Sequence, residues 1–334
     1  CSKQNLDAKR ISNYLVKNGY KLVKNPRNAD LIVLCTCACT NQNSNYSLET
    51  VKKLKKYDAE LIVAGCLPAI DKKELDAIFD GKKISTKDIE NIDSLFEDNQ
   101  IKFSEVDDAN ILIKNTFEDN FSGAVKKVFK KLGFISKFYL KIRNYVFERF
   151  FKEKMMYYKV SKEIKGLYYL RISRGCLSNC SYCAIRFAIG PLKSKPINEC
   201  INEFKKGLDR GYKNFILVAD DLGAYGQDIN TDFPTLLNEL LKIEGDYEIE
   251  LEESHPRWIV KYFDDLKKII RKKKKKKICI PIQSGSSRIL KLMNRYSDVE
   301  KIKDMLIKLK TTDSDIIIGT NFMVGFPTEE IKDF

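Results

Sequence analysis

The first hundred residues contain two kinds of hydrophobic pattern. Apolar residues recur at helical spacing over Leu6–Lys17 and Val51–Tyr57, whereas continuous apolar runs at Ala29–Leu34 and Glu60–Gly65 indicate buried strands. Strands that alternate with helices are typical of a parallel sheet, because the crossover between parallel strands is usually a helix. The pattern therefore predicts an α/β domain with a Rossmann-like parallel sheet.

A second series of strand and helix patterns begins at Gly166. Helical patterns such as Ile197–Gly211 and Asp298–Lys310 separate apolar runs, which is the order of a parallel βα barrel. Catalytic residues of such barrels lie at the carboxyl ends of the strands. The predicted strands are Tyr168–Ser173, Asn214–Ala219, Tyr247–Glu252, Lys277–Ile282 and Asp315–Val324.

The chain has 334 residues, which is enough for two domains with separate cores. We expect an N-terminal domain at residues 1–99, a linker or insertion at 100–165, and a second domain at 166–334. The chain opens on Cys1 and stops at Phe334 within a βα pattern, so we expect it to be trimmed at both ends.

The formal charge of +14 is concentrated in two places. Residues 121–165 hold thirteen Lys or Arg, three Glu and eleven Phe or Tyr, and residues 271–277 are all basic. Basic and aromatic residues together favour RNA, but they also suit a membrane-surface helix or a packed helical linker. The run at 271–277 precedes a predicted strand, so we expect it to be solvated at the face opposite the active site.

Ten cysteines occur without a secretory signal, which favours a reducing compartment where thiols bind metals or catalyse reactions. No apolar run reaches 18 residues, so no membrane span is expected. We therefore predict a cytoplasmic protein. The sequence gives no indication of its oligomeric state.

Three cysteines, Cys176, Cys180 and Cys183, follow the first strand of the second domain in a C-x3-C-x2-C spacing. Closely spaced thiolates on one loop can bind three irons of a [4Fe-4S] cluster and leave the fourth iron open. Structural zinc usually has four ligands, commonly with a second cysteine or histidine pair, and the only histidine is far away at His255. The alternatives of zinc binding and chance spacing are thus disfavoured.

This motif, with Tyr182 before its last cysteine, resembles the radical S-adenosylmethionine (SAM) motif. The run RGCLSNCSYCAIRFAIGPLKSKP is similar to that of the MiaB-like tRNA methylthiotransferases. The resemblance implies an open (β/α)6 barrel, incomplete at the C-terminus. It also implies that the open iron binds SAM, and that reductive cleavage of SAM yields a radical that abstracts hydrogen before a methylthio group is inserted.

The N-terminal domain also places cysteines at the ends of its strands. One strand runs into Cys35, Cys37 and Cys39, the next runs into Cys66, and Cys1 precedes a helix. Because parallel strands bring their carboxyl ends to one edge, this arrangement predicts a second cluster, although buried cysteines also pack as small apolar residues. The resemblance implies Cys1, Cys37 and Cys66 as ligands of this auxiliary cluster. The middle ligand stays open between the three cysteines of the first strand, since Cys35 stands where the family usually has Asn and Cys39 is extra.

Further polar residues follow the strands of the second domain. The carboxylates of Asp220 and Asp221 can bind the ammonium group of SAM, and Gln283 and Ser284 suit its ribose and carboxylate. The order of QSGS, Met-x-Arg and Gly-Phe-Pro resembles the methylthiotransferase pattern, whereas Ile189 and Cys279 depart from it. The residues expected to contact SAM are Tyr182, Asp220, Asp221, Gln283, Ser284, Arg295 and Gly325.

The resemblance implies a radical SAM methylthiotransferase with two [4Fe-4S] clusters, SAM and an external electron donor. We expect a modified adenosine in tRNA as the substrate. One alternative is a radical SAM enzyme with an auxiliary cluster that acts on a ribosomal protein or another substrate. A second alternative is a non-enzymatic, metal-binding RNA adaptor.

Overall fold

The computed structural model describes residues 1–112, 166–270 and 277–334. By the density of contacts, Cys1–Leu112 and Tyr168–Phe334 form one compact unit. The basic aromatic stretch at 121–165 and all but the last residue of the basic run at 271–277 lie outside the described residues, so the predictions made for them stay predictions.

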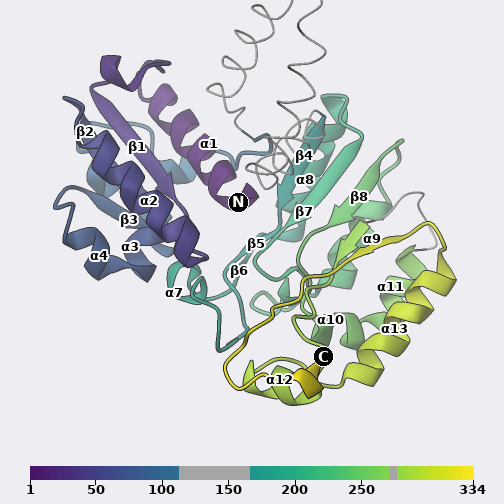
Figure 1. The fold of residues 1–334 in the computed structure, drawn as a ribbon. Coiled ribbons are helices and arrows are strands. Elements are labelled where there is room, and N and C mark those ends of the chain that lie inside the picture. Colours follow the sequence, from purple (N-terminus) through teal and green to yellow (C-terminus); the bar gives the residue numbers. More distant parts are fainter. Residues whose placement is uncertain (113–165, 271–276) are drawn as a thin grey trace, which may run out of the picture. The chain divides into compact units, whose positions relative to one another are not determined.

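The N-terminal part contains the parallel sheet predicted from its hydrophobic pattern. Its strands are ordered β1-β2-β3, and both pairings are parallel (Figure 1). The predicted strand at Glu60–Gly65 is observed with the same bounds, and Leu31 lies opposite Glu60. The main elements are α1 (Ser2–Lys17), β1 (Leu31–Thr36), α2 (Asn41–Leu54), β2 (Glu60–Gly65) and β3 (Lys83–Ser85). Short helices are η1 (Pro26–Asn28), α3 (Leu67–Ile70), α4 (Lys72–Asp76), η2 (Thr86–Leu95) and η3 (Phe103–Glu105).

The two faces of this sheet bury alternate residues of β1, as the period of two along a strand requires. Leu31, Val33 and Cys35 pack into a core with α1 and η2, whereas Ile32 and Leu34 pack into the core on the other face. The first core extends past residue 99, because the buried side chains of Phe103 and Val106 belong to it. The chain therefore continues as part of this core beyond the expected domain end.

The second part contains a five-stranded sheet in the described residues, ordered β10-β9-β8-β7-β4. The pairings β7–β8, β8–β9 and β9–β10 are parallel. Each strand overlaps one predicted from the sequence but ends before the predicted residue, most clearly β9 and β10. This confirms an α/β fold with parallel strands. The strands are β4 (Leu167–Arg171), β7 (Asn214–Val218), β8 (Glu248–Leu251), β9 (Lys277–Cys279) and β10 (Ile317–Gly319).

Helices cover this sheet, and a short antiparallel pair, β5 (Ser173–Arg174) with β6 (Lys193–Ser194), follows β4 (Figure 1). The helix α8 is amphipathic and turns Cys200 and Phe204 into a core that also contains Phe215 of β7. The helices are α7 (Arg186–Ile189), α8 (Ile197–Asp209), η4 (Leu222–Ala224), α9 (Phe233–Leu241), α10 (Pro256–Lys261), α11 (Phe263–Ile270), α12 (Ser287–Leu292), α13 (Val299–Thr312) and η5 (Ile331–Asp333).

Candidate functional site

The segment Arg174–Cys183, here called the cluster loop, leaves the sheet directly after β4 and β5. Its second residue, Gly175, has φ +77°, and a Cβ there would come within 1.9 Å of the Pro191 carbonyl oxygen. Only glycine fits this backbone without displacing the neighbouring chain. The Gly175 N–H donates to Asp220 Oδ2 at 2.8 Å, so the start of the loop is tied to the residue that follows β7.

Two thiols of the cluster loop, Cys176 and Cys180, accept hydrogen bonds of the kind that stabilise iron-bound sulfur. The Ser178 N–H donates to Cys176 Sγ at 3.2 Å, and Arg295 Nη1 donates to Cys180 Sγ at 3.3 Å. Burial raises the pKa of the Cys176 thiol, and the Ser178 N–H acts in the opposite direction. Hydrogen-bond donors of this kind favour the thiolate over the neutral thiol, as bound iron would. The donors around Cys176 and Cys180 therefore fit an iron–sulfur cluster.

Among the described residues, no three Cys, His, Asp or Glu side chains surround a common point as the ligands of a single ion would. A [4Fe-4S] cube does not require this, because each thiolate binds a different iron.

The residues after helix α12 support the cluster loop from a distant part of the sequence. The Ser181 N–H donates to the Met293 carbonyl at 3.0 Å, and Ser181 Oγ donates to the Leu292 carbonyl at 2.9 Å. Arg295 also donates to the Tyr182 hydroxyl at 3.0 Å. Burial raises the pKa of Tyr182, so the side chain remains a neutral phenol. Two residues expected to contact SAM, Tyr182 and Arg295, are thus brought together beside Cys180.

Three of the N-terminal thiols, Cys37, Cys39 and Cys66, follow the ends of β1 and β2. Cys37 Sγ and Cys39 Sγ are 3.4 Å apart, and the hydrogen bond from Cys37 lowers the pKa of Cys39 to about 6. Cys66 is buried, accepts a hydrogen bond from Gln4 Nε2 at 3.4 Å, and its pKa is raised by burial. Cys1 occupies the N-cap position of α1, without a capping hydrogen bond from its side chain. These four thiols come from the loops that the sequence pattern predicted.

Cys35 has a different environment from the other two cysteines of its segment. It lies within β1, opposite Ala64 of β2, and packs into the core beneath α1. Burial raises the pKa of its thiol to about 12. Cys39 is exposed and accepts a hydrogen bond from Asn43 Nδ2 at 3.0 Å. The geometry therefore favours Cys37 or Cys39 over Cys35 as the middle ligand.

The two carboxylates expected at the SAM ammonium already have protein donors. Asp221 is 3% exposed and accepts from Trp258 Nε1 at 2.7 Å and from the His255 N–H at 3.1 Å. Burial raises its pKa, against the effect of these donors. Asp220 accepts from Gly175 and lies 3.3 Å from Lys3 Nζ. Both side chains hold the strand ends in place, and their predicted contact with SAM stays a prediction.

The remaining expected SAM contacts lie beyond the ends of β9 and β10. Gln283 has φ +81° and forms a parallel bridge with Phe322, with its N–H donating to the Asn321 carbonyl at 2.9 Å. Ser284 is buried, and its hydroxyl accepts from the Ser286 N–H at 3.1 Å. Gly325 is exposed with φ +83°. The fold therefore places these residues after neighbouring strands, as predicted.

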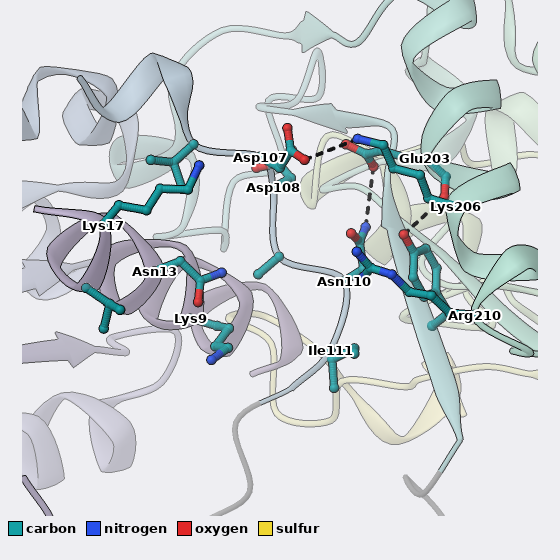
Figure 2. A pocket seen from close by; sticks show the side chains of 14 residues that line it. Lys9, Asn13, Lys17, Asp107, Asp108, Asn110, Ile111, Glu203, Lys206 and Arg210 are labelled. Carbon is teal, nitrogen blue, oxygen red and sulfur yellow. Dashed lines mark hydrogen bonds and ion pairs between the residues drawn. The ribbon is translucent and has the colours of Figure 1, made fainter. Parts of the chain in front are cut away.

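A cavity of about 430 Å³ lies away from the cysteines. Figure 2 shows Lys9 and Lys17 of α1 on one side and Lys206 of α8 on the other, with Asp107 between them. Lys206 Nζ lies 3.2 Å from Asp107 Oδ2. The cavity adjoins the middle and C-terminal end of α1, whereas Cys1 is at its N-terminus. It is therefore separate from the thiol sites.

The sequence matches two family models, each over one part of the chain. Residues 170–334 match the Radical SAM superfamily, and residues 1–85 match the uncharacterized protein family UPF0004. The ribosomal protein uS12 methylthiotransferase RimO of Syntrophomonas wolfei is 32% identical, over 100% of this chain and 69% of the relative. The chain belongs to the radical SAM methylthiotransferases. Enzymes of this family use SAM and two [4Fe-4S] clusters, so the protein is a transferase with these cofactors.

Other members of the family carry a different substrate in their names. A probable threonylcarbamoyladenosine tRNA methylthiotransferase of Methanocaldococcus jannaschii is 27% identical, over 100% of this chain and 69% of the relative. The threonylcarbamoyladenosine tRNA methylthiotransferase of Mus musculus is 29% identical, over 100% of this chain and 52% of the relative. Relatives of this methylthiotransferase thus act on tRNA or on a ribosomal protein.

Solved structures support the fold. The radical SAM methyltransferase TsrM from Kitasatospora setae, solved with cobalamin and a [4Fe-4S] cluster, superposes with a TM-score of 0.61 at 9% identity, over 98% of this chain and 68% of TsrM. The cobalamin-dependent radical SAM enzyme OxsB gives a TM-score of 0.56 at 13% identity, over 98% of this chain and 44% of OxsB. At this identity the similarity concerns the fold alone. None of the described helices has the length and hydrophobicity needed to span a membrane.

Sequence reasoning missed the charged residues that link the two parts of the chain. Lys3 and Asp7 of α1 bind residues beside the cluster loop, and Gln4 binds Cys66. They occupy ordinary polar positions of an amphipathic helix, so nothing in the hydrophobic pattern distinguishes them from solvated residues.

Proposed function

We propose that this methylthiotransferase inserts a methylthio group into a C–H bond of a modified adenosine in tRNA. Cys176, Cys180 and Cys183 hold the SAM cluster, and Cys1, Cys37 and Cys66 hold the auxiliary cluster. When bound, the clusters supply an electron for SAM cleavage and the sulfur for transfer. The donors to Cys176 and Cys180 support the first assignment, and the thiols that follow β1 and β2 support the second.

The protein's own residues hold the reacting groups in place. Arg295 orients both the Cys180 thiol and the Tyr182 ring, and Gly175 allows the loop to pass close to Pro191. Gln283 and Ser284 follow β9, where backbone and hydroxyl groups can bind the polar parts of SAM. An external electron donor completes the reaction, because no side chain of this set supplies an electron.

The observation that carries the choice of tRNA is the formal charge of +14, with its concentration of Lys and Arg at 121–165. The phosphates of RNA attract such a charge. Each phosphate that a Lys or Arg neutralises increases the affinity of the protein for RNA, and this contribution falls as the salt concentration rises. The names of the archaeal and mouse relatives agree with this substrate.

A second candidate is ribosomal protein uS12. It is favoured by the 32% identity to the Syntrophomonas wolfei enzyme, which exceeds the identity to the tRNA-modifying relatives named above. A ribosomal protein that binds RNA is itself basic, and a strongly basic enzyme would repel it. For this reason we place tRNA first.

Mass spectrometry of a strain lacking this protein separates the two substrates. Loss of a methylthio-adenosine from digested tRNA, with uS12 peptides unchanged, is the expected result. Loss of the methylthio group from uS12, with tRNA nucleosides unchanged, would instead establish the second candidate. Purified protein that contains iron but does not cleave SAM under reducing conditions would contradict both, and would favour a metal-binding RNA adaptor.

We also place the reaction in the cytoplasm. All ten cysteines lie in the described residues and are free thiols, as a reducing compartment favours.

A further inference from the structure

The helix α1 is attached to both thiol sites. Cys1 occupies its N-cap position, and two charged residues in its first two turns, Lys3 and Asp7, bind residues that lie on or next to the cluster loop. The N-terminal sheet and the strands of the second part are therefore connected through this helix by charged side chains.

Asp7 makes the more deeply buried of these connections. Its Oδ1 atom lies 2.5 Å from Arg171 Nη1 and 2.9 Å from Arg174 Nη2. Asp7 is 2% exposed and Arg171 is 5% exposed, so this ion pair is shielded from water and salt. Arg171 also donates through Nη2 to the Lys3 carbonyl at 2.8 Å. Arg174 is the first residue of the cluster loop and lies two residues before Cys176.

Lys3 makes the second connection. Its ammonium lies 3.3 Å from Asp220 Oδ1 and 2.5 Å from Glu253 Oε2. The other oxygen of Asp220 accepts the Gly175 N–H at 2.8 Å. A short series of contacts therefore runs from Lys3, two residues after Cys1, through Asp220 to Gly175, which directly precedes Cys176.

We propose that Lys3 and Asp7 are positioning residues that fix Cys1 relative to Cys176, and thus set the separation of the two clusters. The inference rests on the proposed function, because it assigns these two thiols to different clusters. Methylthio transfer requires that the carbon from which hydrogen is removed also reaches the sulfur. An error of about 1 Å in such an arrangement can reduce a rate about a hundredfold. The buried pair of Asp7 and Arg171 suits this role best, since removing one partner leaves a buried charge without compensation and allows the helix to move.

The test compares Asp7→Asn and Lys3→Met with a matched control, Tyr14→Phe. The Tyr14 hydroxyl donates to Asp93 Oδ1 at 2.8 Å, so the control removes a polar contact of the same helix that stays inside the N-terminal part. Each protein is reconstituted anaerobically and its iron content is measured. Two readouts follow: the ratio of 5′-deoxyadenosine to methylthio product, and the magnetic coupling between the two reduced clusters by pulsed electron paramagnetic resonance.

We expect both test variants to keep the iron content of the unmodified protein and to cleave SAM. The ratio of 5′-deoxyadenosine to product should rise about 10- to 100-fold, and the magnetic coupling should weaken or broaden. The control should leave both readouts unchanged, and Asp7→Glu should restore part of the coupling.

Unchanged ratio and coupling in both test variants would overturn the proposal. An equal rise of this ratio in the Tyr14→Phe control would also overturn it, since a general loosening of α1 would then explain the effect. If Asp7→Asn does not fold, Lys3→Met decides, because its ammonium lies nearer the surface. Should the unmodified protein make no methylthio product, the proposed function fails, while altered coupling in the test variants still supports the positioning role.

Discussion

Replacement of Arg295 by Gln should lower the midpoint potential of the SAM cluster. The Arg295 guanidinium donates to Cys180 Sγ at 3.3 Å and to the Tyr182 hydroxyl at 3.0 Å. A positive charge beside the sulfur stabilises the reduced cluster more than the oxidised one, because the reduced cluster carries one more electron. Removing that charge therefore makes reduction harder, and SAM cleavage should slow at a fixed donor potential.

The magnitude follows from the separation of Arg295 Nη1 and Cys180 Sγ. Two unit charges 3.3 Å apart interact by about 5 kcal/mol at an effective dielectric constant of about 20. The added electron is shared among four irons, so roughly a quarter of this, about 1.2 kcal/mol, acts on the reduction. For one electron this corresponds to a shift of about 50 mV to more negative potential.

A redox titration followed by electron paramagnetic resonance measures this shift. Arg295→Lys keeps the charge and should shift the potential by less than half as much. Ser181→Ala is the matched control, since Ser181 Oγ binds the Leu292 carbonyl and joins the same two segments through a bond that ends on oxygen. A potential in Arg295→Gln equal to that of the unmodified protein, with iron content retained, would refute this reasoning.

Four further predictions concern the cysteines, the cluster loop and RNA binding. Replacing all three loop cysteines should remove about half of the roughly eight irons expected for two four-iron clusters, together with all SAM cleavage, as iron analysis and chromatography would show. Cys37→Ala should lose the auxiliary cluster whereas Cys35→Ala keeps it, and the reverse iron contents would make our assignment of that segment wrong. Gly175→Ala should lower the free energy of unfolding in urea by more than about 2 kcal/mol, because it adds a backbone clash to a strained φ. Gly211 has φ +79° but open space where a Cβ would lie, so Gly211→Ala should lower it by only about 1 kcal/mol. Changing four lysines of the stretch 121–165 to Gln should weaken tRNA binding and flatten its salt dependence. An unchanged salt dependence would mean that this stretch does not contact RNA. These lysines are Lys126, Lys127, Lys130 and Lys131.

The sequence by itself determined those features that depend on neighbouring residues. The alternation of apolar runs and helical patterns located the strands of both sheets except β3, because a strand buried on one or both faces appears as an alternating or continuous apolar run. The spacing of Cys176, Cys180 and Cys183 fits within one loop, so the chemistry of that loop could be predicted without knowing any distant contact.

Only the tertiary structure decided the features that depend on distant residues. Cys35 and Cys37 are two positions apart, yet Cys35 belongs to the core beneath α1 while Cys37 lies beside Cys39, since β1 ends between them. Arg295 reaches Cys180 across 115 positions of the chain, and Arg171 reaches Asp7 across 164.

No period or spacing encodes such pairs, because a charged residue in an amphipathic helix looks the same whether it meets water or a buried partner. The pairing of Lys3 with Asp220 and of Asp7 with Arg171 is therefore decided by how the sheets and helices pack. A charge that this packing buries needs a partner of opposite charge beside it.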